Sequence, residues 1–392
     1  MINLMKKRIH HQDIKLSSVF RLYFKNSNTK PEQCCIFSLA LLQPAATPPC
    51  RLYSTPLSDP ENKGVAQRGI NFDTLGTWDN RLNFPLLVEQ SKKAGLPIPK
   101  ITLENIGHST VLGRRTVNED RLKISQLTPD VSYFAMFDGH GGAIAADFAC
   151  DFLEDHIKFW MRDESNLLTV LKQSFIDLNN KLSRHMYYDY IKKPINPKGK
   201  GEMNGGTTAT VCLLRHSTEL CIGHVGDSRA ILCRRAQSLR LSVDHEPEDE
   251  NEQKRIKQRG GMVTHNSIGS TMVNNRLAMT RSIGDVELKR FGVTAIPYTR
   301  SIQIKHGYDA FLVLTSDGIN YVMNDQELCD LISSTKSPSE AANIVTDQAL
   351  HYGSEDNSSV IIIPFGAWGK YAKTKQSAPY VFGRNILGRR YS

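Results

Sequence analysis

Four apolar stretches of this chain each adjoin an acidic residue that stands beside a small or polar one: three run into the acid, and the fourth follows it. The four acids are Asp138, Asp227, Asp317 and Asp356, and a fifth acidic pair, Glu119-Asp120, precedes the stretch that begins at Arg121. Carboxylates gathered at strand ends repel one another and lose hydration unless a cation lies among them. A single Asp-Gly pair is usually a turn, but the recurrence predicts a metal site.

The residue types indicate which ion such a site would bind. The candidate ligands are hard oxygen donors, and no His or Cys set has zinc spacing, so the sequence favours Mg²⁺ or Mn²⁺ over Zn²⁺. His140 follows Asp138 in the same glycine-rich loop. A lone histidine is usually a satisfied core residue, but next to a metal cluster it becomes a candidate general acid. Motifs of other hydrolases and nucleotide-binding proteins, such as GxSxG, HExxH and GxxxxGK, are absent from the sequence.

Strands and helices must position these residues. Strands are predicted at residues 121–126, 133–137, 209–214, 220–225, 230–234, 311–315 and 359–364, and helices at 143–162, 166–191, 247–259, 325–334 and 338–351. The strands on either side of residues 226–229 are too close for a crossover helix, which predicts an antiparallel hairpin there. Helices in consecutive pairs and strands in runs predict an α+β fold with helices packed outside antiparallel sheets.

The net charge of +9 is concentrated at the two ends of the 392-residue chain. Residues 1–53 hold eight Lys or Arg and two acids, and residues 367–392 hold six Lys or Arg and no acid. The region between them has 35 basic and 38 acidic residues, with no basic run interleaved with aromatics. This distribution argues against nucleic acid as a partner.

The first 53 residues have the composition of a mitochondrial transit peptide. They are basic and poor in acids, and a helix over residues 14–25 would have one face formed by Leu16, Phe20, Tyr23 and Phe24. Arg51-Leu52-Tyr53-Ser54 resembles a processing site, although a disordered basic arm is the alternative. No apolar run reaches the roughly 20 residues that cross a bilayer, so the mature protein is expected to be soluble. We therefore predict a transit peptide at 1–53, an extension at 54–99, a catalytic domain at 100–366 and a basic tail at 367–392.

The chain contains eight cysteines, three of which lie in the predicted transit peptide. The other five, at positions 150, 212, 221, 233 and 329, stand singly inside apolar runs and form no CxxC pair. They are expected to be buried reduced thiols, not a zinc site or a disulfide framework.

A set of ordered motifs resembles the metal-dependent serine/threonine phosphatases of the 2C type over about residues 100–365. The first is Asp138-Gly139-His140-Gly141-Gly142, with Arg115-Thr116-Val117-Asn118-Glu119-Asp120-Arg121 upstream. The others follow in the family's order: 205–209, 226–230, 244–247, 255–261, 281–285, 316–318 and 356–357. The resemblance implies a β-sandwich of two antiparallel sheets flanked by helix pairs, with two Mn²⁺ or Mg²⁺ ions at one end.

The resemblance also implies a role for each candidate residue. The implied metal ligands are Asp138, which would bridge both ions, the Gly139 carbonyl, Asp317 and Asp356, with Glu119 and Asp120 acting through bound waters. Arg115 would bind the substrate phosphate, although a purely structural salt bridge remains the alternative for this residue. A water shared by the ions would attack phosphorus while His140 protonates the leaving seryl or threonyl oxygen.

The chain departs from the family pattern after Asp317. Family members usually read Ser-Asp-Gly-x-Trp-Asp there, whereas this chain has Asn320 and Tyr321 in the last two places. The missing aspartate weakens any third metal site. Asp227 is therefore either a metal ligand or mainly a residue of the turn at 226–229.

The transit-like start and the Asn320-Tyr321 variation further resemble the branch of this family found in the mitochondrial matrix. That branch acts on the E1α subunit of the branched-chain α-keto acid dehydrogenase complex. The alternatives are another mitochondrial phosphoprotein, a small phosphoester, or a non-catalytic scaffold with the same fold. A scaffold would be expected to lose metal aspartates, but Asp138, Asp317 and Asp356 are all present.

Overall fold

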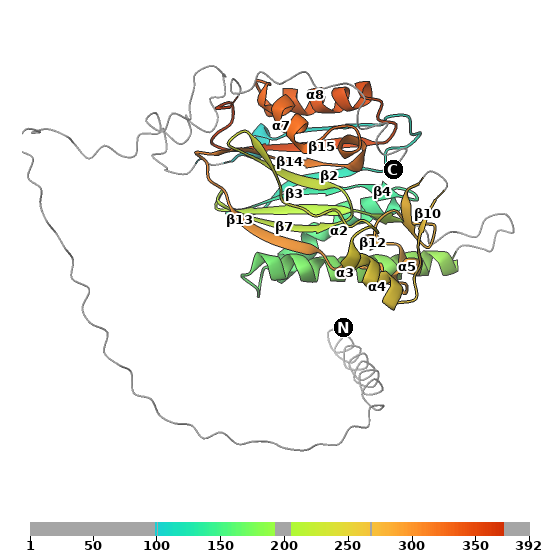
Figure 1. Ribbon diagram of the computed structural model, residues 1–392. Coiled ribbons are helices and arrows are strands. Elements are labelled where there is room, and N and C mark those ends of the chain that lie inside the picture. Colours follow the sequence, from blue (N-terminus) through green and yellow to red (C-terminus); the bar gives the residue numbers. More distant parts are fainter. Residues whose placement is uncertain (1–98, 100, 193–204, 267–268, 372–392) are drawn as a thin grey trace, which may run out of the picture. The chain divides into compact units, whose positions relative to one another are not determined.

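Figure 1 shows a computed structural model of the chain, which describes residues 99, 101–192, 205–266 and 269–371. The predicted transit peptide, the predicted extension apart from residue 99, and most of the basic tail lie outside the described residues. Within the described part of the chain, no helix combines the length and apolar character needed to cross a membrane.

Two five-stranded antiparallel sheets form the centre of the domain. The first sheet has the order β1 (Gly107–Val111), β15 (Ser358–Pro364), β14 (Asp309–Thr315), β8 (Arg229–Arg234) and β9 (Gln237–Arg240). The second sheet has the order β13 (Tyr298–Gln303), β7 (Glu219–Val225), β6 (Ala209–Arg215), β3 (Val131–Phe137) and β2 (Arg121–Thr128). Neighbouring strands are antiparallel throughout both sheets, as in other β-sandwiches.

The strand sequences explain why the sheets are covered on both faces. β3 is buried along its whole length. Because successive side chains point to opposite faces, Tyr133 and Phe137 pack toward the helices, while Phe134 and Met136 pack into the core between the sheets. Such continuously apolar strands require a layer on each side. The domain accordingly has four layers, with helices outside two stacked sheets (Figure 1).

Each sheet is covered by one pair of helices. α2 (Ile144–Trp160) and α3 (Leu167–Lys192) cover the second sheet, and α7 (Asp325–Ser333) and α8 (Pro338–His351) cover the first (Figure 1). α7 begins after Asn324, whose side chain accepts hydrogen bonds from the first turn, and α8 begins after a capping Ser337. Residues 367–371 extend this layer, since Trp368 is 7% exposed and packs edge-on against Phe311.

Shorter elements complete the end of the domain where the candidate site lies. β4 (Gly139–His140), β5 (Gly206–Thr207) and β12 (Ile283–Gly284) form a small sheet, and β10 (Val263–His265) pairs with β11 (Thr271–Val273). The short helices at this end are α4 (Glu250–Gln258), α5 (Val286–Lys289) and α6 (Asp317–Asn320), whereas η2 (Leu103–Asn105) precedes β1 at the other end of the sandwich. The small sheet brings the His140 loop next to the segment before α5.

All seven predicted strands and all five predicted helices are present, with ends that differ by at most three residues. The α+β class with helices outside antiparallel sheets is confirmed. The predicted hairpin at residues 226–229 is wrong, because β7 belongs to the second sheet and β8 to the first. Both strands are apolar on both faces, so either could pair in either sheet, and their closeness in sequence did not determine the pairing. The turn instead carries the chain from one sheet to the other.

Candidate active site

Strand register places three of the candidate aspartates at one end of the first sheet. Thr315 at the end of β14 pairs with Arg229 at the start of β8 and with Val360 near the start of β15. Asp317, Asp227 and Asp356 stand within a few residues of these three positions, beyond the strand ends. Residues far apart in sequence are therefore neighbours in the fold.

The second sheet contributes two more acids at the same end of the sandwich. Arg121 at the start of β2 pairs with Phe137 at the end of β3, so Asp120 and Asp138 flank this pair. The two sheets meet where the backbone N–H of Asp317 approaches Asp138 Oδ2 at 3.4 Å. Asp138 is thus the point at which the acids of the two sheets come together.

The four most enclosed of these acids, Asp120, Asp138, Asp227 and Asp317, are called here the strand-end carboxylates. Burial, followed by the charges of neighbouring acids, raises the pKa of Asp138 well above its usual value. The same two causes raise the pKa of Asp227 to about 7 and contribute to a pKa of about 6 for Asp120. Asp317 also has a raised pKa, through burial and the charge of Asp356. Together they form a region of unbalanced negative charge.

Two oxygens of this group are buried without partners. Among the described residues, Asp120 Oδ1 and Asp227 Oδ1 accept no hydrogen bond, although Asp120 Oδ2 accepts one from Ser359 Oγ at 2.6 Å. Buried polar atoms normally find a partner. A divalent cation would pair these oxygens and offset the mutual repulsion, so the all-oxygen donor set fits Mg²⁺ or Mn²⁺.

The acids are not yet arranged around a single point. In the described ranges, no three His, Cys, Asp or Glu side chains are placed to hold an ion together. They are close enough to raise one another's pKa, yet side-chain rotations would be needed to close on a cation. One such rotation concerns Asp356, whose Oδ2 accepts a 2.7 Å hydrogen bond from Arg115 Nη2.

Arg115 lies in the loop between β1 and β2, opposite Asp356. Its ion pair with Asp356 agrees with the salt-bridge alternative, but 60% of the arginine side chain and 37% of the aspartate side chain are exposed. An exposed ion pair contributes little to stability, so this arginine can exchange its partner for a phosphate. Glu119 lies near enough to add its charge to that of Asp356, and both raise the pKa of Arg115.

Hydrogen bonds between the Asn357 side chain and backbone groups hold the two loops that carry these residues. The Glu119 N–H donates to Asn357 Oδ1 at 2.8 Å, and the Asn357 amide donates to the carbonyls of Leu112 and Val117. Gly139 packs so tightly that a Cβ there would lie 2.7 Å from the Glu119 carbonyl oxygen. The Asp-Gly sequence is therefore needed for close approach, beyond any role in a turn.

His140 is held by an acid that the sequence did not identify. Its Nε2 lies 2.9 and 3.0 Å from the two carboxylate oxygens of Asp285, 145 residues away. Burial opposes protonation of the imidazole, but the hydrogen bond and charge of Asp285 outweigh it, and the pKa of His140 is raised. Asp285 thereby fixes the orientation of the ring.

The surroundings of Asp285 hold its carboxylate in place. Asp285 has a left-handed backbone with φ 46°, which Asp tolerates better than most residues, and it accepts a 2.5 Å hydrogen bond from Ser282 Oγ. A Cβ at Gly206 would collide with this carboxylate and lie 2.6 Å from His140 Nε2. The motif 281–285 was the only sequence signal for this residue.

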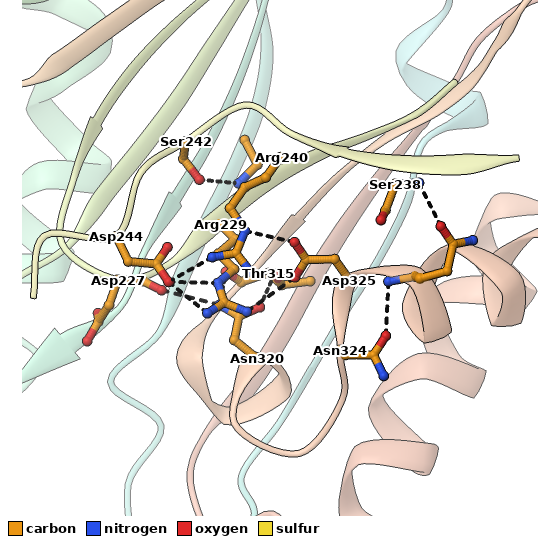
Figure 2. A network of polar contacts seen from close by, with 12 residues as sticks. Asp227, Arg229, Ser238, Arg240, Ser242, Asp244, Thr315, Asn320, Asn324 and Asp325 are labelled. Carbon is orange, nitrogen blue, oxygen red and sulfur yellow. Dashed lines mark hydrogen bonds and ion pairs between the residues drawn. The ribbon is translucent and has the colours of Figure 1, made fainter. Parts of the chain in front are cut away.

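A network of arginines and acids lies beside Asp227 (Figure 2). Arg229 donates to Asp244 Oδ2 at 2.7 and 2.9 Å and lies 3.2 Å from Asp325, which also pairs with Arg240 at 2.7 Å. Here every carboxylate faces an arginine. The network fixes the start of β8 and hence the turn that carries Asp227.

Asn320 secures the same turn from the other side. Its Nδ2 donates to the Asp227 carbonyl oxygen at 3.3 Å, and its Oδ1 accepts from Thr315 Oγ1 at 2.6 Å (Figure 2). Asn320, one of the two residues that depart from the family pattern, therefore holds the backbone of the turn that carries Asp227. Asp227 also lines a cavity of about 520 Å³, together with Arg115, Asp317 and Asp356.

Comparisons with known proteins agree with this fold. The model of the family described as Protein phosphatase 2C matches residues 107–358, and the chain belongs to this family. The fold resembles a serine-threonine phosphatase 2C from Toxoplasma gondii, with a TM-score of 0.56 and 20% identity over 66% of this chain and 94% of that chain. A C. elegans sex determining protein gives a TM-score of 0.60 with 24% identity, covering 71% of this chain and 70% of that one.

Proteins of similar sequence also support the family assignment. A Xenopus laevis protein named "Protein phosphatase 1K, mitochondrial" is 47% identical over 322 residues, which cover 82% of this chain and 84% of the relative. A Saccharomyces cerevisiae protein named "Protein phosphatase 2C homolog 1" is 33% identical over 64% of this chain and 88% of its own length. The protein is thus a metal-dependent serine/threonine protein phosphatase, as its motifs predicted.

Proposed function

We propose that this protein is a mitochondrial matrix phosphatase that hydrolyses phosphoserine on the E1α subunit of the branched-chain α-keto acid dehydrogenase complex. The similarity to a relative named as mitochondrial, at 47% identity over 82% of the chain, supports the compartment. The basic, acid-poor residues 1–53 support it independently, as a transit peptide. The substrate rests on the resemblance of the motifs and of the Asn320-Tyr321 variation to the matrix branch of the family.

One observation carries the catalytic part of the proposal: the strand-end carboxylates of both sheets meet at one end of the sandwich, and within the described part of the chain none of them has an arginine or lysine as an ion-pair partner. Those of the first sheet, Asp227 and Asp317, line one cavity. Arg115 and Asp356 line this cavity. An excess of buried carboxylates with raised pKa values at a cavity is more typical of a functional site than of a structural ion-pair network.

The proposed metal ligands are the residues named from the sequence. Two Mn²⁺ or Mg²⁺ ions would be held by Asp138, the Gly139 carbonyl, Asp317 and Asp356, with Glu119 and Asp120 acting through bound waters and Asp227 at the edge of the group. When bound, such ions supply an activated water as the nucleophile and neutralise charge on the phosphoryl oxygens. The buried acids themselves exclude competing anions until the cations are present.

Two further side chains act on the substrate directly. Arg115 leaves Asp356 and binds the phosphate through its planar pair of N–H donors. His140, oriented by Asp285, donates a proton to the departing seryl oxygen, since an alkoxide is a poor leaving group. Both roles depend on side chains from loops that the sandwich holds at one end.

The proposed organisation follows from the same reasoning. Residues 1–53 would be removed on import, 54–99 form an extension, 100–366 form the catalytic domain, and 367–392 form a basic tail. The first residues of that tail, as described above, pack against the first sheet.

The test is hydrolysis of native phosphoproteins. Phosphorylated mitochondrial matrix extract, labelled with ³²P, is incubated with the protein and Mn²⁺, with Asp317→Ala as the inactive control. We expect the E1α band of the dehydrogenase complex to lose label first, and excess chelator to prevent the loss.

Each other outcome selects a different function. Loss of label from another band only would identify a different phosphoprotein substrate. Hydrolysis of small phosphoesters without any loss of protein label would indicate a small-molecule phosphatase. No hydrolysis of either, despite Mn²⁺-dependent stabilisation of the fold, would indicate a scaffold.

A further inference from the structure

Tyr321 stands one helical turn beyond the proposed metal ligand Asp317. Its backbone N–H donates to the Asp317 carbonyl oxygen at 2.8 Å, which continues the turn of α6. Residues four apart on a helical turn lie on the same face, with Cβ atoms about 5–6 Å apart. The Tyr321 side chain is therefore close to the reaction centre, and 67% of the residue is exposed.

Tyr321 also lines the cavity that contains Arg115, the candidate phosphate-binding residue. Val322 and Tyr352 line the same cavity, together with Arg115, Asp317 and Asp356. One part of the wall is thus built for a phosphate, and an adjoining part presents two aromatic rings and a branched aliphatic side chain. No gap in the cavity separates the two parts, since they line one continuous space.

Charged residues elsewhere in this wall lie near opposite charges. Arg229 is bound by Asp244, Glu355 is bound by Arg114 at 2.6 Å, and Glu246 lies near enough to Arg240 to help raise the pKa of that arginine. The wall beside the proposed phosphate site is therefore electrostatically balanced, apart from the acids assigned to the ions. A balanced wall with aromatic rings favours an apolar side chain over a charged one.

We propose that Tyr321, Val322 and Tyr352 form a subsite that binds an apolar side chain of the substrate, aliphatic or aromatic, within two residues of the phosphoserine. An extended peptide advances about 3.3 Å per residue, so one or two residues span the distance from phosphate to ring. This inference rests on the proposed phosphatase function and adds a preference among phosphoproteins. The aromatic residue at the place of the missing family aspartate becomes a determinant of specificity.

The test is a set of phosphoserine peptides that differ only at the two positions on each side of the phosphoserine, where Leu or Phe is compared with Asp. They are assayed with the full chain and Mn²⁺. For the wild type we expect kcat/KM to be about 10-fold higher for the apolar residue at one of these positions, the effect of filling a small apolar pocket. Tyr321→Ala should remove the preference, and Tyr321→Phe should keep it because the ring remains.

Tyr308→Ala is the matched control. Tyr308 is also an exposed tyrosine, at 43%, but it stacks with Arg235 and does not line the cavity. Its removal should leave the preference unchanged. Tyr321→Ala, at an exposed position, should also keep the thermal midpoint of the wild type.

Two results would overturn the subsite while leaving the phosphatase function intact. The first is a wild type that hydrolyses all the peptides at one rate. The second is a Tyr321→Ala variant that slows every peptide by the same factor, which would make the ring a general support of the site. Failure of the wild type to hydrolyse any peptide with Mn²⁺ would instead overturn the proposed function itself.

Discussion

Two groups of buried acids in this domain have opposite surroundings. The strand-end carboxylates lie among other acids, and their pKa values are raised. Glu252 of α4 is only 4% exposed, yet it accepts hydrogen bonds from Arg255 at 2.7 Å and from Arg281 at 2.6 Å. Burial alone would raise the pKa of Glu252, but these arginines and Thr280 hold it well below its usual value.

The difference shows that burial does not decide the role of an acid in this protein, whereas the counter-ion does. Where the chain supplies arginines, as at Glu252 and in the network of Figure 2, the acids hold loops in place. Where it supplies none, the acids depend on a cation from solution. The unpaired group is therefore the candidate functional one.

The strongest test of this comparison removes one acid of the unpaired group. We expect Asp317→Ala to lower Mn²⁺-dependent hydrolysis of a phosphoserine peptide by at least about 1000-fold, because metal ions supply several kcal/mol of transition-state stabilisation. Glu252→Gln, assayed at a temperature at which it is folded, should stay within a few-fold of the wild type. Activity of Asp317→Ala within tenfold of the wild type would contradict the comparison.

His140 and Asp285 sharpen the comparison, because here an acid is paired with a residue of the proposed chemistry. His140→Ala should slow alkyl phosphates about 100-fold and aryl phosphates much less, since a phenolate leaves without a proton. Asp285→Asn should show the same selectivity, to a smaller extent, because the ring loses its orientation. Equal losses on both substrate classes in His140→Ala would remove the general-acid role.

Neutralising an acid should change the free energy of unfolding in opposite directions in the two groups. Glu252→Gln is expected to lower the free energy of unfolding by about 3 kcal/mol, since it removes the counter-ion of two partly buried arginines, Arg255 and Arg281. Asp227→Asn in chelator should leave it unchanged or raise it, because it removes a repelling charge. Chemical denaturation of both variants measures these changes. If Asp227→Asn lost as much free energy of unfolding as Glu252→Gln, the two environments would not differ.

The loss of folding stability at low pH provides a further test of the role of Glu252. A carboxyl group with a lowered pKa in the fold stabilises the protein above its unfolded value of 4.5, and this contribution is lost as the pH falls toward the folded value. Glu252→Gln should therefore be less sensitive than the wild type to a decrease in pH below about 4.5. A parallel loss in both proteins would locate the acid sensitivity elsewhere.

The smallest effect is expected at two neighbouring arginines of one loop. Arg114 pairs with Glu355 at the surface, where the two side chains are 77% and 69% exposed, so Arg114→Ala should change stability by less than about 1 kcal/mol and leave kcat/KM unchanged. Arg115→Ala should lower kcat/KM about tenfold or more through loss of a phosphate contact. Similar kinetics for the two variants would indicate that Arg115 serves only its ion pair with Asp356.

The sequence predicted the strands well because they are continuous apolar runs that end in turn residues. Val131–Phe137 and Ser358–Pro364, for example, are buried throughout, and their boundaries are marked by polar residues. The strands that were not predicted, such as β9 and β13, have exposed or mixed patterns and obtain their structure from a neighbouring strand. Local pattern could not reveal them.

The placement of residues from different strands relative to one another was harder to predict from the sequence. The strand-end acids could be named because their chemistry repeats, but their meeting depends on the register of two sheets. The turn at 226–229 was misassigned because proximity in sequence does not choose between sheets. Asp285 stands in one of the motifs, but its role is evident only in the structure, since its contact with His140 spans 145 residues and depends on the close approach of Gly206.

The division of the acids between the two sheets has a consequence for folding order. An intermediate in which only one sheet had formed would present a part of the ligand set, from Asp120 and Asp138 or from Asp227 and Asp317, and would bind divalent ions weakly. High affinity would arise only after the sheets have stacked, so cations would stabilise the finished molecule without recruiting partly folded chains. Newly synthesised chains would then become active in the same step in which the sandwich closes.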